Sequence, residues 1–149
     1  MLAIHYPTKI SKIAAMAANL NPDGLHADTL DFLKSSVESR PITQGRELKI
    51  ASITLDQPNI DVKALETITA PTLILAGDHD MVLDEHTLEI FHRIPNSQLA
   101  IVPDSTHLLP FDDPELFNSI VERFFRTPFK TRDRIEDAVM SIEKMLQSH

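Results

Sequence analysis

The residues best suited to chemistry lie in two short loops, each following an apolar run. The segment Gly-Asp-His-Asp ends at Asp80 and follows the run 71–76, and the segment Pro-Asp-Ser-Thr-His ends at His107 and follows the run 98–102. If both runs are neighbouring parallel strands, their carboxyl ends are adjacent and the carboxylate of Asp80 can accept a hydrogen bond from the imidazole of His107. Such a bond fixes the tautomer of the ring and stabilises the imidazolium formed when the ring takes a proton. The alternative is a turn-capping aspartate and an ordinary loop histidine.

A metal site is a second interpretation of the same region. Acidic and histidine side chains, whose oxygen and nitrogen atoms suit divalent cations, crowd nine positions: Asp78, His79, Asp80, Asp84, Glu85 and His86. The dipole of the following helix explains its acidic start without a metal. Glu89 and His92 have helical spacing, but a dinuclear site needs a matching pair from another helix, and none appears. We therefore expect no metal. We also expect no cofactor, because neither G-x-G-x-x-G nor G-x-x-x-x-G-K occurs.

Composition excludes several further classes. The chain of 149 residues carries 14 basic and 22 acidic residues, a net charge of −8, and no cysteine. A phosphate backbone would be repelled, so we expect no nucleic-acid partner, and without cysteine there is neither a disulfide nor a thiol nucleophile. No apolar run is long enough to cross a bilayer, and the first residues do not resemble a signal peptide, so we expect no membrane partner and a cytoplasmic location.

The pattern of apolar residues predicts the elements that position the two loops. Strands are expected at 71–76 and 98–102, whereas 9–18 fits a strand or a helix by periodicity alone. Helices are expected at 84–94 and from Asp113-Pro114, a capping residue followed by proline at the first helical position, to near Pro128. The stretch 19–69 shows helical patterns at 28–37 and 46–55, separated by Pro41, and no strand signal. This order predicts an α/β fold with a parallel sheet.

The last segment, residues 132–146, predicts an amphipathic helix with one narrow apolar stripe. The stripe consists of Ile135, Val139, Ile142, Met145 and Leu146. A stripe of this width is suited to docking, either on the rest of the chain or on a partner.

Three segments of the sequence, taken in their order and spacing, resemble a known protein family. P-T-L-I-L-A-G-D-H-D, then I-P-N-S-Q-L-A-I-V-P-D-S-T-H, then D-D-P-E-L-F closely resemble the C-terminal part of α/β-hydrolase-fold enzymes, and the resemblance spans residues 1–128. It implies a helix end and first strand at 1–18, a helical cap at 19–69 and a core with the acid and base loops at 70–128, followed by the tail at 129–149. It identifies Asp80 with the acid and His107 with the base of the family's catalytic triad, and 9–18 with a strand.

The resemblance also implies the reaction, hydrolysis of a small ester or related acyl compound by a serine in a G-x-S-x-G turn. That motif does not occur in the sequence, and the family's spacing would place it roughly seven residues upstream of Met1. We expect none of Ser11, Ser52 and Ser105 to replace it. The chain alone is therefore expected to be a truncated, inactive remnant of a catalytic site.

Two further expectations concern the surroundings of the pair. The family usually has glycine where this chain has Thr106, so the base loop must adopt an ordinary backbone conformation. The resemblance implies that cap residues line an apolar substrate pocket, and the candidates are Leu20, Leu30, Phe32 and Leu33. The alternative function is a non-catalytic interaction or oligomerisation module that self-associates through an exposed strand edge or the tail helix.

Overall fold

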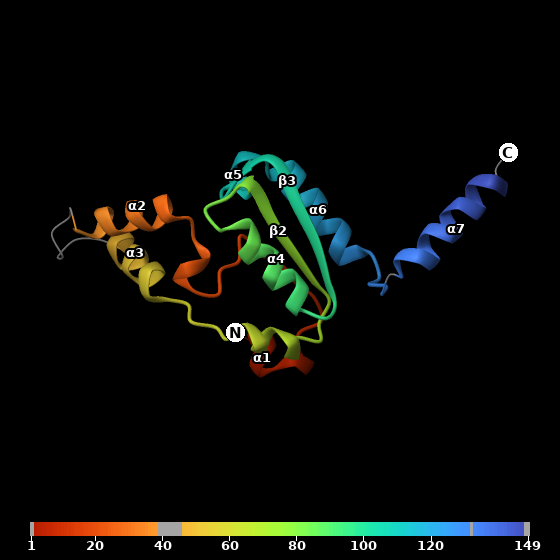
Figure 1. Cartoon of the computed structure of the whole chain (residues 1–149), viewed down its shortest axis with the longest axis horizontal. Helices are drawn as coiled ribbons and strands as arrows, with labels where there is room; N and C mark the ends of the chain where they lie inside the picture. The colour runs from red at the N-terminus through yellow and green to blue at the C-terminus, as the bar shows by residue number, and fades with distance from the viewer. Residues whose placement is uncertain (1, 39–45, 132, 148–149) are drawn as a thin grey trace.

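A computed structural model describes residues 2–38, 46–131 and 133–147 of the chain (Figure 1). Its sheet has the order β1-β2-β3, and both neighbouring pairs are parallel. The strands are β1 (Ile13–Met16), β2 (Thr72–His79) and β3 (Ser97–Thr106). The predicted fold class, an α/β arrangement with three parallel strands and flanking helices, is confirmed.

The helices agree closely with the apolar patterns where they are described. In chain order they are α1 (Leu2–His5), the 3-10 turns η1 (Pro7–Lys9) and η2 (Pro22–Gly24), α2 (Ala27–Glu38), α3 (Arg46–Asp56), the 3-10 helix η3 (Val62–Thr67), α4 (Asp84–Arg93), α5 (Leu109–Asp112), α6 (Pro114–Arg126) and α7 (Arg134–Gln147). Pro41 and residue 132, which belong to predicted segments, lie outside the described residues.

Strand β2 is buried on both faces because helices cover the sheet from two sides. On one side Ile74 packs with buried residues of η3 and α4, among them Leu65 and Ile90. On the other side Leu73 and Leu75 pack against Phe124 of α6. A continuous apolar run such as that of β2 is expected for a strand whose two faces are both shielded from water.

Helix α6 is fixed at both ends by polar contacts. At its start the Asp113 carboxylate accepts a hydrogen bond from the Leu116 N–H at 3.0 Å, and Pro114 occupies the first turn. At its end Lys12 Nζ donates to the carbonyl oxygens of Phe124 and Thr127, at 2.8 and 2.7 Å. Lys12 directly precedes β1, so these bonds hold the C-terminus of α6 against the edge of the sheet, where a positive charge also complements the helix dipole.

The predicted limits of all three strands need correction. Strand β2 continues beyond Ala76 to His79. Strand β1 occupies only four of the positions 9–18, because η1 precedes it and Ala17 turns the backbone. Strand β3 does not stop at Pro103 but continues to Thr106. Proline is tolerated there because β3 lies at the edge of the described sheet, where a missing N–H breaks no ladder bond on the open side.

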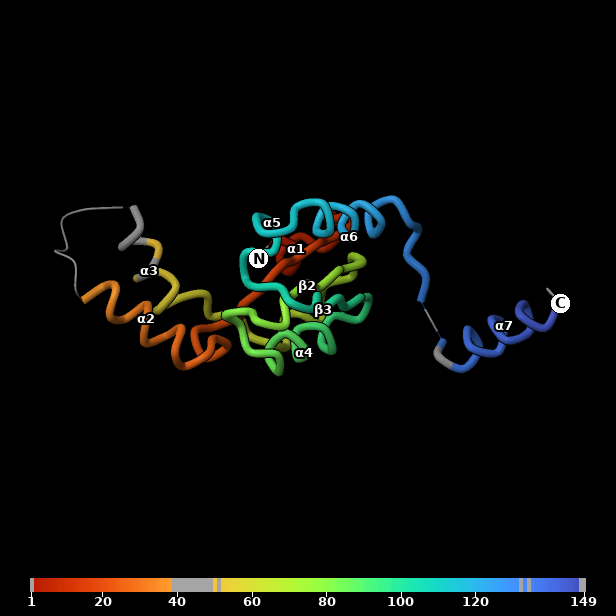
Figure 2. Tube along the Cα trace, turned by 90° about the horizontal axis from the view of Figure 1, so that it is seen from above, coloured from red at the N-terminus to blue at the C-terminus, as the bar shows by residue number. Residues whose placement is uncertain are grey.

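Three helices, α2, α3 and α7, lie away from the sheet in both views (Figures 1 and 2). Helices α2 and α3 pack on each other and project from one end, at the place where the resemblance puts a cap. Helix α7 lies beyond the end of α6, with its apolar stripe exposed. No helix in the described ranges is long and apolar enough to cross a membrane.

Ala17, directly after β1, has a left-handed backbone conformation with φ of 50°. This conformation is unfavourable for a residue with a Cβ atom and free for glycine. Ala17→Gly is therefore expected to raise the free energy of unfolding by about 0.5–1 kcal/mol, measured by urea denaturation. A lower unfolding free energy in the variant would show that the turn does not carry this strain.

Candidate active site

Asp80 and His107 meet at the carboxyl ends of β2 and β3. His107 Nδ1 lies 2.8 Å from Asp80 Oδ1, and because a carboxylate only accepts, the ring nitrogen donates. The Asp80 side chain is fully buried, whereas 36% of the His107 side chain is exposed. A buried carboxylate therefore holds the His107 ring at Nδ1. The two residues lie at the carboxyl ends of neighbouring strands, as the sequence predicts.

Backbone N–H groups complete the surroundings of the Asp80 carboxylate. Oδ1 accepts from the Val82 N–H at 3.1 Å, and Oδ2 accepts from the Gly77 N–H at 3.4 Å. Burial alone would raise the pKa of Asp80, but the bonds from His107, Val82 and Gly77 outweigh it, so the pKa is lowered. The acid is thus held in its ionised form.

The same bond acts in the opposite sense on the base. The hydrogen bond to Asp80 raises the pKa of His107 above its ordinary 6.5, against the effect of burial, which lowers it. An imidazole held in this way is a stronger base at its other nitrogen, Nε2.

These two shifts predict how the pair stabilises the fold as the pH changes. The contribution of His107 is complete below its unfolded pKa of 6.5 and is lost as the pH rises through its raised pKa. The contribution of Asp80 is present above 3.8 and is lost as the pH falls through its lowered pKa. The stability difference between the natural chain and His107→Ala should therefore be largest between pH 3.8 and 6.5. Urea denaturation across this range measures it, and a difference that grows above the raised pKa would contradict the assignment.

Gly77 allows the two strand ends to approach closely enough for this contact. A Cβ atom at Gly77 would lie 2.0 Å from the Ser105 carbonyl oxygen, a distance no side chain can occupy. The register between β2 and β3 shifts between Gly77 and His79, and Asp104 opposite has a positive φ of 55°. The glycine and the bulge together turn the base loop toward Asp80.

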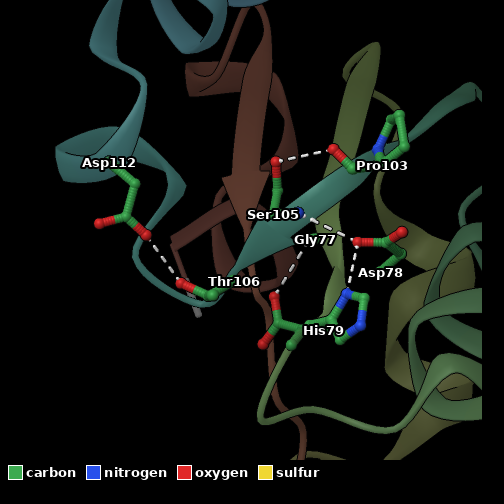
Figure 3. A network of polar contacts seen from close by, with 8 residues as sticks. Gly77, Asp78, His79, Pro103, Ser105, Thr106 and Asp112 are labelled. Carbon is green, nitrogen blue, oxygen red and sulfur yellow. Dashed lines mark hydrogen bonds and ion pairs between the residues drawn. The ribbon is translucent and has the colours of Figure 1, made fainter.

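Asp78 fastens the same turn from the outer side (Figure 3). Its Oδ1 accepts from the Ser105 N–H at 3.0 Å and from His79 Nδ1 at 2.9 Å. The bond from His79, followed by the backbone amides of Ser105 and Asp104, lowers the pKa of Asp78 to about 2. The first aspartate of the G-D-H-D segment, Asp78, thus has a structural contact to β3, and the histidine of the segment, His79, is bonded to Asp78.

Thr106, which stands where glycine is usual in the resembled family, stabilises the loop by its hydroxyl group. Thr106 Oγ1 donates to Asp112 Oδ2 at 2.9 Å and accepts from the Leu108 N–H at 3.0 Å (Figure 3). Its φ is not in the left-handed region, as expected from the sequence. The contact between Thr106 and Asp112 was not predicted from the sequence, and the signal that could have suggested it is a Thr and an Asp six positions apart around a turn.

The three serines weighed as nucleophiles lie elsewhere. Ser105 Oγ donates to the Pro103 carbonyl oxygen at 3.3 Å, within its own strand. Ser11 precedes β1, at the opposite ends of the strands, and Ser52 lies on α3. Among the described residues, Asp80 is the hydrogen-bond partner of the His107 ring. None of these three serines is therefore hydrogen-bonded to the His107 ring in the part of the chain that the structure describes.

The candidate substrate residues are not gathered at this pair. Leu20 is 4% exposed and belongs to the core beside Leu65 and Ile68. Leu30 and Leu33 are half-buried on α2, and Phe32 is 64% exposed. Their contact with a substrate stays a prediction.

Among the described residues, no group of three or more His, Asp or Glu side chains is arranged to hold a metal ion. The acidic and histidine residues of 78–86 are instead distributed between the pair, the bond to β3 and the first turn of α4.

Comparison with known proteins identifies the fold. No protein family profile matches the chain. A protein of Bacillus subtilis (strain 168) named as a 2-succinyl-6-hydroxy-2,4-cyclohexadiene-1-carboxylate synthase is 32% identical over 60 residues, which are 40% of this chain and 22% of that protein. Among solved structures, MGS-M2, an alpha/beta hydrolase enzyme from a Medee basin deep-sea metagenome library, matches 89% of this chain with a TM-score of 0.67 and 17% identity.

Two esterases match in the same way. A thermophilic esterase from Thermogutta terrifontis covers 83% of this chain with a TM-score of 0.63 and 18% identity, and the carboxylesterase CesB from Bacillus subtilis covers 83% with a TM-score of 0.57 and 17% identity. The chain has the α/β-hydrolase fold. It spans 54% to 62% of the length of these three structures, and the resemblance to the C-terminal portion of the fold is confirmed.

Proposed function

We propose that this chain supplies the acid and the base of a serine-hydrolase active site for ester or related acyl compounds. The observation that carries the proposal is the 2.8 Å contact between a fully buried Asp80 and His107 at the strand ends. In the α/β-hydrolase fold this is the place where ligands and catalytic groups lie. The chemistry named for the esterases of similar fold agrees with this arrangement.

In each half of the proposed reaction His107 first accepts a proton from the attacking group and then donates it to the leaving group. A serine oxygen attacks the ester carbonyl while its proton passes to Nε2 of His107, and Nδ1–H stays bonded to Asp80. When the carbon–oxygen bond to the alcohol breaks, Nε2 returns the proton to the leaving oxygen. Water then attacks the acyl carbon while one of its protons passes to Nε2 of His107. The bond between the serine oxygen and the acyl carbon breaks, Nε2 returns the proton to the serine oxygen, and the carboxylic acid leaves.

The serine of this scheme comes from outside the 149 residues, because the sequence has no G-x-S-x-G. We therefore expect the isolated chain to hydrolyse p-nitrophenyl acetate no faster than its His107→Ala variant. Turnover by the natural chain that His107→Ala abolishes would contradict the proposal, since it would reveal a nucleophile within the chain.

The positive test uses a polypeptide that does contain the nucleophile turn, either an in-frame upstream extension of this chain or a separate chain. With that group present, His107→Ala and Asp80→Asn should each lower kcat by about 10⁴-fold. Thr106→Ser, which keeps the hydroxyl bonded to Asp112, is the matched control and should keep kcat nearly unchanged. Turnover insensitive to His107→Ala would show that the pair has no catalytic role.

A second candidate, an interaction or oligomerisation module, rests on two apolar surfaces. Helix α7 exposes its stripe, with Ile135 at 74%, and an apolar hollow of about 530 Å³ lies beside β1 among α1, η3 and α4. Self-association through the edge of β1 or through α7 would cover such surfaces.

The cytoplasmic location and the lack of nucleic-acid and membrane partners stay predictions from charge and hydropathy.

Light scattering tests the second candidate. We expect the full chain to self-associate, and Ile135→Lys with Ile142→Lys to reduce the measured mass if α7 is the contact, because charge on the stripe opposes burial. Glu136→Lys, on the polar face, is the matched charge control. A monomeric full chain would rule out this candidate.

A further inference from the structure

The base of the cap is joined to the acid loop by a short series of contacts that the mechanism above does not use. The Leu83 N–H donates to the Gly24 carbonyl oxygen at 2.9 Å, and the His26 N–H donates to the Met81 carbonyl oxygen at 3.1 Å. Between these bonds Leu25 and Val82 form an antiparallel bridge. The first turn of the cap is thereby paired with the residues directly after Asp80.

One side chain, His86 on the first turn of α4, closes this joint. The Leu20 N–H donates to His86 Nε2 at 3.0 Å, so Nε2 accepts and the ring is neutral in this contact. Gly24 packs flat against the ring, since a Cβ atom there would lie 2.6 Å from both Cδ2 and Nε2 of His86. The imidazole thus fills a space that is shaped around it and holds the point where the chain leaves β1 for the cap.

Burial lowers the pKa of His86 below its ordinary 6.5, against the charge of Glu89 on the next turn of α4, which raises it. The other ionisable groups near the joint are exposed: Asp23 and His26 on the facing segment, and Asp84 and Glu85 on the first turn of α4. The neutral ring is therefore the form that the surroundings favour.

Val82 links this joint to the catalytic acid. Its N–H donates to Asp80 Oδ1, the same oxygen that accepts from His107, while the residue itself is bridged to Leu25. We propose that His86 is a positioning residue: its neutral imidazole holds the start of the cap against the acid loop and thereby keeps the Val82 N–H on Asp80. The role of Asp80 as the acid rests on the proposed function, whereas the mechanical coupling does not.

Protonation of His86 removes the acceptor for Leu20. The joint is therefore complete at pH values above 6.5 and opens as the pH falls through the lowered pKa of His86. We expect the contact between the cap and the loop that contains Asp80 to loosen as the pH falls.

Amide hydrogen exchange on the full chain, followed by NMR at a series of pH values and corrected for the intrinsic exchange rate, tests this coupling. His86→Gln keeps an oxygen near the position of Nε2 but cannot be protonated, and His86→Leu removes the acceptor. In the natural chain the protection of both Leu20 and Val82 should fall on acidification below pH 6.5. His86→Gln should abolish this pH dependence, and His86→Leu should lower both protections about tenfold at every pH. The Ile74 amide, in the buried centre of β2, is the internal control and should not change.

Three results would overturn the coupling. They are unchanged Leu20 protection in His86→Leu, a loss at Leu20 without a loss at Val82, and the same pH dependence in His86→Gln as in the natural chain. If His86→Leu does not fold, Gly24→Ala adds a Cβ atom that would lie 2.6 Å from the His86 ring and 2.4 Å from Asn19 Oδ1. It displaces the ring without removing its acceptor nitrogen and should lower the same two protections. None of these readouts depends on turnover, so a failed esterase test leaves this inference standing and a failed exchange test leaves the acid–base proposal standing.

Discussion

Asp80→Ala is expected to lower the free energy of unfolding by about 2–3 kcal/mol, because it leaves the buried Val82 N–H without an acceptor and removes the charged partner of His107. Urea denaturation between pH 3.8 and 6.5, where both members of the pair are charged, measures the full effect. Water cannot replace the lost hydrogen bonds, because none of the Asp80 side chain is exposed.

Asp80→Asn separates the two parts of this effect. The amide oxygen can still accept from Val82, but it carries no charge to stabilise the His107 imidazolium. We expect a smaller loss than in Asp80→Ala. Asp78→Ala serves as the positional control, because Asp78 is another carboxylate bonded to a backbone N–H and a histidine, but the side chains of Asp78 and His79 are 37% and 73% exposed. Equal losses in Asp80→Ala and Asp78→Ala would argue against a special role of the buried pair.

Gly77→Ala is expected to have the second large effect, about 1–3 kcal/mol of lost stability, because its Cβ atom would collide with the Ser105 backbone. The strand ends must separate to admit the methyl group, which also moves His107 away from Asp80. Thermal or urea unfolding gives the first effect, and the ring-proton chemical shifts of His107 give the second.

Ser105→Ala is the matched control for this substitution. It leaves the backbone contact with Gly77 in place and removes only the hydroxyl that bonds to Pro103. A stability close to that of the natural chain is expected. If Gly77→Ala leaves both the stability and the His107 signals unchanged, the close approach does not position the base loop.

The elements that could be predicted from the sequence are those whose signals are local. The apolar run of β2 and the Asp113-Pro114 start of α6 each combine pattern and capping within a few residues, and both appear where expected. The neighbouring loops that bring Asp80 and His107 together follow from strand order, which the resemblance supplies. Such elements can be predicted because neighbouring residues, rather than contacts between distant parts of the chain, determine their structure.

Features that depend on distant contacts were not predicted. Strand β3 passes through Pro103 because no described strand pairs with its outer edge, which periodicity does not reveal. The Thr106–Asp112 bond depends on how the base loop folds, and the Leu20–His86 bond joins residues 66 positions apart. Leu20 packs in the buried cluster beside Leu65 and Ile68, whereas its predicted contact with a substrate stays a prediction, because an apolar residue in a sequence fits a core and a pocket equally well.

A pH titration of the His107 ring by nitrogen-15 NMR, in the natural chain and in Asp80→Asn, measures whether Asp80 sets the tautomer and the pKa of this histidine. We expect a proton on Nδ1, a free Nε2 and a pKa above 6.5 in the natural chain, and a lower pKa in Asp80→Asn. The same His107 pKa in both proteins, or a neutral ring protonated at Nε2, would contradict the claim that Asp80 holds this histidine ready to act as a base.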